Sequence, residues 1–171
     1  MGSELAAAGT NVQLKFTAQS WLVSLYINCP PDWEGIHCPS PAALANFTEA
    51  VEKQWITWHA FPFNAEPEFY NPDMFAFGVD LTHHVDAKLG VANKTVLSQR
   101  DVPGMTRSVI PILRRHGVDT ISVGVNGGST PPNLPQAFKW LDPTSGESVT
   151  ALYLQGGCRS QGWRERMVEI G

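Results

Sequence analysis

Charge is scarce in this sequence, and so are cysteine and long apolar runs. Only 16% of its 171 residues are charged, and the 12 lysines and arginines are scattered apart from Arg114–Arg115 and three arginines near the C-terminus. A nucleic-acid-binding face needs clustered basic side chains, so we expect no nucleic-acid partner. No apolar run reaches the roughly 20 residues that cross a bilayer, and residues 1–9 lack the basic start and apolar centre of a signal peptide. We therefore expect a soluble chain with no membrane contact and no export signal of its own.

The three cysteines are too few for a disulfide scaffold. Cys29 and Cys38 flank a proline-rich loop short enough to be closed by a bridge, and the sequence leaves open whether they form one. Zinc-finger chemistry is excluded because Cys29, His37 and Cys38 have no second ligand pair. Sequons for N-glycosylation begin at Asn46 and Asn93. With the two cysteines, they favour a secretory or extracellular location.

Phosphate-binding glycine loops and the glycine-flanked serine of serine hydrolases are also missing, which removes support for nucleotide and serine-hydrolase chemistry. Apolar residues nevertheless make up 43% of the chain, enough for one sizeable core. We expect a single domain over residues 12–155, a disordered N-terminus over 1–11 and an irregular C-terminal tail over 156–171.

The apolar periodicity changes repeatedly along this domain. Capping residues, apolar stripes and closing glycines predict helices over 40–54, 71–90 and 106–116, and residues 18–28 also favour a helix. Strands are predicted over 12–17, 55–58, 95–99 and 118–125, followed by a hairpin of 138–141 and 147–154. This order is typical of βαβ units, so we predict an α/β fold with a mostly parallel sheet, part of a (β/α) barrel.

In such folds the chemistry is located at the carboxyl ends of the strands. The loop 59–66 follows one strand and combines aromatic rings with polar groups, as sugar-binding sites do. Its candidate sugar-binding residues are His59, Phe61 and Asn64, and Glu66 is a candidate carboxylate. The alternative is that Phe61 and Phe63 fill the end of a barrel and His59 is a hydrogen-bonded structural residue.

A second candidate loop, 99–104, places Asp101 beside Arg100, where a carboxyl group could act as a general acid. Asp101 could instead cap the following helix. Arg100 and Asn126, which follows the next strand, are further candidates for sugar binding. His83, His84 and Asp86 form a motif that suggests a metal, but their helical spacing favours a solvated face.

Four segments resemble one enzyme family. Three of them are Trp58–Asn64 after a strand, the long helix ending Leu89–Gly90, and Phe138–Trp140 leading to Ser145–Gly146. The fourth and most specific is Asp101–Gly104 followed by Ile110–Val118. The block from about 16 to 155 resembles the barrel of glycoside hydrolase family 38, the zinc-dependent retaining α-mannosidases, in a divergent branch.

The resemblance implies a carbohydrate-active protein of mannose metabolism that hydrolyses O-glycosyl bonds in an oligosaccharide or glycan. It places Asp101 at the acid/base position and residues 59–64 at the position of the nucleophile, an aspartate that also binds zinc. No aspartate is present there, so Glu66 is the nearby substitute, and His59 is the candidate zinc ligand.

The family's other zinc ligands would lie outside these residues. We therefore expect a truncated form that lacks part of the active site, is inactive on α-mannosides, and self-associates through open sheet edges. The alternative is a non-catalytic glycan-binding or interaction module on the same fold.

Overall fold

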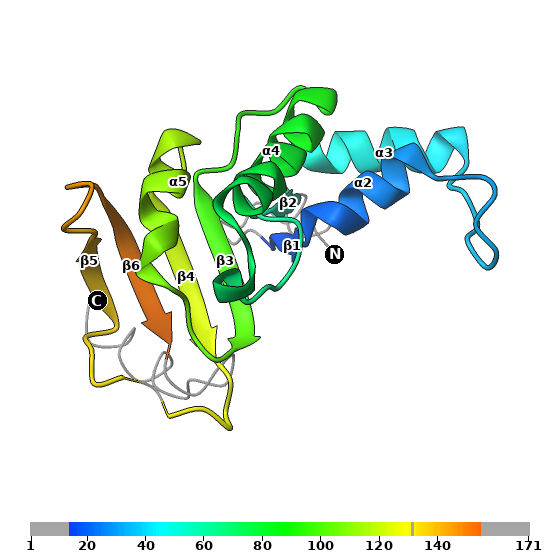
Figure 1. Ribbon diagram of the computed structural model, residues 1–171. Helices are drawn as coiled ribbons and strands as arrows, with labels where there is room; N and C mark the ends of the chain where they lie inside the picture. Colours follow the sequence, from blue (N-terminus) through cyan, green and yellow to red (C-terminus); the bar gives the residue numbers. More distant parts are fainter. Residues whose placement is uncertain (1–13, 131, 155–171) are drawn as a thin grey trace, which may run out of the picture. The chain divides into compact units, whose positions relative to one another are not determined.

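The computed structural model describes residues 14–130 and 132–154, so the predicted segments 1–11 and 156–171 lie outside the described residues (Figure 1). Where the sequence predicts one domain, the chain divides into two compact units. Unit 1 contains the residues up to Phe63 together with Leu81–Lys94, and unit 2 contains Asn64–Asp80 and the residues from Thr95 onward. No helix in the described ranges is both long and apolar enough to cross a membrane.

Unit 1 is built on a two-stranded parallel pair, β1 (Phe16–Ala18) and β2 (Ile56–Trp58). Between them in sequence lie the helices α2 (Ser20–Asn28) and α3 (Pro41–Glu52). The Ser40 side chain accepts a hydrogen bond from the Ala43 amide at the start of α3, and Pro41 occupies its first turn, as the capping pattern predicts. The C-terminal part of α4 (Pro72–Lys88) completes the unit.

The core of unit 1 includes a buried apolar cluster of Val23, Val51, Trp58 and Val85. Its four members come from α2, α3, β2 and α4, so each of these elements is anchored by at least one apolar side chain. A further buried contact joins α2 to α4, where the Ser20 and Thr82 hydroxyl oxygens lie 2.7 Å apart.

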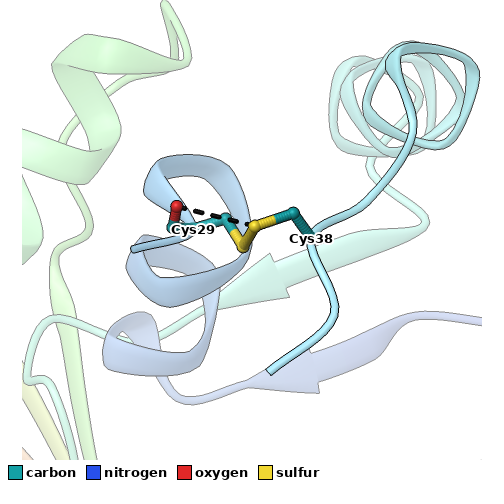
Figure 2. Close-up of a disulfide and its surroundings, with 2 residues drawn as sticks. All are labelled: Cys29 and Cys38. Atoms are coloured by element: carbon teal, nitrogen blue, oxygen red, sulfur yellow. Dashed lines mark hydrogen bonds between the residues drawn. A yellow bond between two sulfur atoms is a disulfide. The ribbon is translucent and has the colours of Figure 1, made fainter. Parts of the chain in front are cut away.

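A disulfide between Cys29 and Cys38 closes the loop that follows α2 (Figure 2). The two Cα atoms lie 5.5 Å apart, within the range that a bridge requires. The structure thus decides the pairing that the sequence leaves open. Disulfides persist in oxidising compartments, so this bridge is consistent with an extracellular location.

Unit 2 contains a four-stranded sheet in the order β3-β4-β6-β5 within the described part of the chain (Figure 1). The strands are β3 (Val96–Val102), β4 (Thr120–Val125), β5 (Ala137–Leu141) and β6 (Ser148–Leu154). The pairs β3–β4 and β4–β6 are parallel, and β5–β6 is the predicted antiparallel hairpin. Five of the six β4 residues are buried, which is expected of a strand covered on both faces.

Short helical elements complete unit 2: the 3-10 helices Pro67–Phe69 and Arg107–Val109, and α5 (Ile110–Arg115), which lies across one face of the sheet (Figure 1). Pro111 lies in the first turn of α5, so the predicted helix 106–116 begins later than its first residues, because proline is tolerated only in the first turn. The fold is therefore mixed α/β with parallel-rich sheets, as predicted.

The buried face of α4 differs in part from the predicted one. The sequence predicts a stripe of Met74, Phe77, Leu81, Val85 and Leu89. Val85 is buried and Leu89 packs against the core of unit 1, but Met74, Phe77 and Leu81 are 53%, 62% and 44% exposed. The other buried positions of the helix are Phe75, Gly78, Val79, Thr82 and Asp86. Two of them are polar, so a search for apolar periodicity does not find them.

Candidate functional site

Asp101 lies inside β3, not in the loop predicted from the sequence. The pairing with β4 passes from Arg100 opposite Gly124 to Val102 opposite Val125, which leaves Asp101 as an inserted residue. Its φ of 60° is in the left-handed region, which aspartate adopts more readily than most residues. Such a bulge redirects a side chain and is common next to active sites.

The alternative role of Asp101 as a helix cap is wrong. The residues at the cap positions of the following 3-10 helix and of α5 are Thr106 and Val109. Asp101 is instead exposed at the carboxyl end of β3, where its side chain is available to solutes.

Asn126 orients the Asp101 carboxyl group. It follows β4 directly, and its Nδ2 donates to Asp101 Oδ1 at 2.9 Å. The other end of the same amide is held as well, since Asn126 Oδ1 accepts from the Gly128 amide at 2.7 Å, and Asn126 N donates to the Val102 carbonyl at 2.8 Å. The parallel pairing of β3 and β4 thus brings two predicted site residues into contact, 25 positions apart in sequence.

Arg100 and Asn64 form a second contact at this edge. Asn64 Oδ1 accepts from the Arg100 backbone amide at 3.0 Å. The Arg100 guanidinium reaches across to β4, where Nη1 donates to the Ser122 carbonyl at 2.8 Å and Nη2 to Ser122 Oγ at 2.9 Å. Arg100 therefore links the two strands that present Asp101 and Asn126.

Gln99 also belongs to this edge, although it is not among the site residues predicted from the sequence. Its side chain is fully buried, and its Oε1 accepts from the Ala65 amide at 2.6 Å. This bond fixes the segment 64–66 beside β3, with Asn64 and Glu66 both exposed. The sequence contains one signal for this role. Gln99 comes two residues after Leu97 in a strand, so both side chains point to the same buried face, and a buried amide needs a hydrogen-bond partner.

The two remaining predicted residues, His59 and Phe61, belong to unit 1. His59 is partly buried. Phe61 is 1% exposed and packs edge to face on Phe63, with ring centroids 5.9 Å apart. Phe61 is therefore a core residue, as the alternative interpretation has it, and its ring is not free to stack on a sugar. Phe63, 39% exposed, offers the accessible ring of this loop.

Zinc, which the family resemblance implies, takes thiolate, imidazole and carboxylate ligands. The β3–β4 edge offers the exposed carboxylates of Asp101 and Glu66. The hydrogen-bond partners described above for Asp101 and Asn64 are a side-chain amide and a backbone N–H, which are not zinc ligands. Elsewhere in unit 2, His116 Nδ1 and Asp80 Oδ1 lie 2.8 Å apart, an imidazole and a carboxylate of the kinds that zinc accepts.

Comparison with known proteins locates the fold. The sequence matches no protein-family model, and no curated protein is significantly similar to it. Among solved structures, 4-alpha-glucanotransferase from Thermococcus litoralis superposes with a TM-score of 0.59 at 12% sequence identity. The match covers 92% of this chain and 24% of that chain, so this chain spans about a quarter of the enzyme's length. At this identity the likeness shows a shared fold alone.

Proposed function

We propose that this chain is a carbohydrate-active protein whose sugar site lies at the carboxyl ends of β3 and β4. The observation that supports it most is the Asp101 carboxyl group, exposed on a bulge and oriented by Asn126. An oriented carboxylate beside amide groups matches the hydrogen-bonding needs of sugar hydroxyls, which both donate and accept. The structural neighbour is named for transfer of α-glucan, which is further support for a carbohydrate ligand.

The finer proposal follows the family resemblance: the fold is part of a (β/α) barrel, and the ligand is an α-mannoside. In it Asp101 is the acid/base, Glu66 the nucleophile, and Asn64, Arg100 and Asn126 bind or position the sugar. A retaining glycosidase separates its two carboxyl groups by about 5 Å, a spacing that Asp101 and Glu66 would need to reach with substrate bound. The resemblance also implies zinc, and its candidate ligand His59 belongs to unit 1. Zinc would supply Lewis-acid polarisation of a sugar oxygen when bound.

In the catalytic version of this proposal, the protonated Asp101 carboxyl group donates its proton to the glycosidic oxygen as the bond to the leaving sugar breaks. Arg100 does not transfer a proton, because a guanidinium remains charged. Its bonds to Ser122 hold β3 and β4 in register, so its role is to position Asp101.

A non-catalytic glycan-binding module is the second candidate, and one observation favours it. Asp101 Oδ1 accepts a hydrogen bond from the Asn126 amide, and this carboxyl–amide pair can accept hydrogen bonds from sugar hydroxyls without any bond of the sugar being broken. Binding and turnover must therefore be measured separately.

The proposal is tested by titrating the full chain with methyl α-D-mannopyranoside and with maltose, following backbone amides by NMR. We expect shifts at Asn64, Asp101 and Asn126. Asp101→Asn should weaken binding about tenfold, because a hydrogen bond to a charged group contributes about 1.5 kcal/mol or more. Asparagine also tolerates the left-handed backbone, so the variant should fold.

Asp119→Asn is the matched control. Asp119 is an exposed carboxylate just before the amino end of β4, the strand paired with β3, and its replacement should leave binding unchanged. Hydrolysis of an aryl α-mannoside, with or without zinc, that Asp101→Asn reduces by about 10²-fold or more would assign catalysis to the edge. Binding of a sugar without its hydrolysis would show that the chain is a non-catalytic glycan-binding module. A folded chain that binds neither sugar would overturn the proposal.

A further inference from the structure

Unit 1 contains a cavity of about 410 Å³ that is remote in sequence from Asp101. Its walls come from α2, the start of the disulfide-closed loop, the residues after β2, and the C-terminal part of α4. The volume lies within the range of pockets that hold small ligands, roughly 300–1,000 Å³. All of the lining residues belong to unit 1, so the cavity is a property of that unit.

Three aromatic side chains line this cavity and remain exposed: Trp21 at 42%, Trp33 at 59% and Phe63 at 39%. Single exposed apolar residues are ordinary on a protein surface, but large aromatic rings that share one concavity are a mark of a binding site. Flat ring faces suit the C–H surfaces of a pyranose.

Polar groups accompany the rings. Ser24, Asn28 and His84 line the same cavity, and Asn28 Nδ2 donates to Ser24 Oγ at 3.0 Å. Asn28 Oδ1 accepts from Lys88, so both ends of this amide are held. A hydroxyl, an amide and an imidazole can each pair with sugar hydroxyls.

The charge of the lining selects among ligand classes. No lysine, arginine, aspartate or glutamate is among the lining residues that the structure describes. A phosphorylated or acidic ligand would find no lysine or arginine in the lining, since the nearby Lys88 ammonium is bonded to Asn28, and a basic peptide would find no carboxylate there. The lining therefore favours a neutral ligand with both C–H faces and hydroxyl groups.

The disulfide holds one wall of the cavity in place. Pro30 and Trp33 both line it, and both lie in the loop between Cys29 and Cys38. The Trp33 amide donates to the Pro30 carbonyl at 3.4 Å, and the Ile36 amide to the Trp33 carbonyl at 3.2 Å. The bridge joins two residues that are nine positions apart and so closes a short loop. This closure limits the conformations available to Trp33.

We propose that this cavity is a second saccharide-binding site, which takes a neutral sugar unit against Trp21, Trp33 and Phe63 and depends on the Cys29–Cys38 bridge for its Trp33 wall. It rests on the proposed function for the class of its ligand, but it uses none of the residues of the β3–β4 edge.

The test is calorimetric and NMR titration of the full chain with methyl α-D-mannopyranoside and maltose. Trp33→Ala should weaken binding at this site about tenfold, with loss of the shifts at Ser24 and Asn28. Trp33 is exposed on a loop, so the variant should keep its fold. Phe69→Ala is the matched control, because Phe69 is an aromatic residue 82% exposed outside the cavity, and it should bind as the wild type does.

The double variant Cys29→Ser/Cys38→Ser tests the bridge. It should lose affinity as Trp33→Ala does, and addition of dithiothreitol to the wild type should have the same effect. Circular dichroism of each variant must match the wild type before its binding is compared.

The outcomes separate the two proposals. If Asp101→Asn abolishes binding while Trp33→Ala and the serine variant bind normally, the cavity site is overturned and the β3–β4 edge survives. If Trp33→Ala removes one set of shifts and Asp101→Asn removes another, both sites stand. If wild-type protein instead self-associates through Trp33 and binds no sugar, the cavity is a protein contact and this inference is overturned.

Discussion

Asp86 is the residue whose environment differs most from its sequence interpretation. The helical spacing of His83, His84 and Asp86 favours a solvated face, yet Asp86 is fully buried. Trp58 Nε1 donates to its Oδ1 at 2.7 Å, and the Lys94 backbone amide donates to its Oδ2 at 3.0 Å. The Lys94 ammonium lies 3.5 Å from the same carboxylate and 4.5 Å from the centroid of the Trp58 ring.

Asp86→Ala should therefore lower the free energy of unfolding by about 3 kcal/mol, because the buried Trp58 N–H, the part-buried Lys94 amide and the half-buried Lys94 ammonium would lose this partner. Chemical denaturation followed by tryptophan fluorescence measures this loss. Glu52→Ala, which removes an exposed carboxylate from the last turn of α3, should change stability by less than about 0.5 kcal/mol. Equal losses in the two variants would show that the Asp86 contacts contribute nothing specific.

Among the elements, the β5–β6 hairpin follows most directly from local sequence. Asp142 organises its turn, since Asp142 Oδ2 accepts from the Ser145 amide at 3.0 Å and Gly146 takes the left-handed φ of 75° that the turn requires. The Ser145 side-chain hydrogen bond, with the Ser145 and Thr144 amides and the nearby Arg107 guanidinium, lowers the pKa of Asp142 below its usual 3.8, although partial desolvation opposes this.

A lowered pKa in the folded state means that ionised Asp142 stabilises the hairpin above the ordinary Asp pKa, and that this contribution is lost as the pH falls through the lowered value. Amide hydrogen exchange at Ser145 and Gly146 should thus accelerate, after correction for intrinsic rates, only below about pH 4. In Asp142→Asn the exchange should already be faster at pH 6 and should lack this acid dependence. A wild-type profile that stays flat down to pH 2 would rule out the role of the carboxylate.

In the whole molecule, the described sheet of unit 2 ends in two edge strands, β3 and β5. The β5 edge has Ala137, Lys139 and Leu141 exposed, with Leu141 at 52%, and the rings of Phe138 and Trp140 pack against each other at 6.2 Å. Unpaired N–H and C=O groups along such an edge can pair with another chain. Self-association through this edge is a proposal that the sequence already suggests.

The double variant Ala137→Lys/Leu141→Lys adds charge to the β5 edge and should shift sedimentation velocity profiles toward the monomer at high protein concentration, because like charges oppose edge pairing. Placing the same two lysines at exposed Met74 and Phe77 of α4 is the control for net charge, and it should not have this effect. A wild type that stays monomeric at all concentrations would exclude edge pairing.

Local chemistry was sufficient to predict the elements. Ser40–Pro41 starts α3, alternating apolar residues mark the hairpin, and the order of helices and strands indicates an α/β fold with mainly parallel pairing. These features depend on neighbours a few positions apart, so a sequence contains them in full. The candidate residues Asn64, Asp101 and Asn126 could be selected in the same way, because strand ends can be recognised locally.

Long-range packing decided the rest. The bulge at Asp101 arises from its register with β4, the buried face of α4 from partners such as Ser20 and Trp58, and the burial of Phe61 from the chain around it. The division into two units and the cavity beside Trp33 likewise need residues far apart in sequence to meet. The closure of Cys29 with Cys38 spans only nine positions, but it depends on the conformation of the loop between them. A polar side chain such as Asp86 is buried only when the fold brings hydrogen-bond partners to it. The spacing of apolar residues along the sequence does not predict those partners.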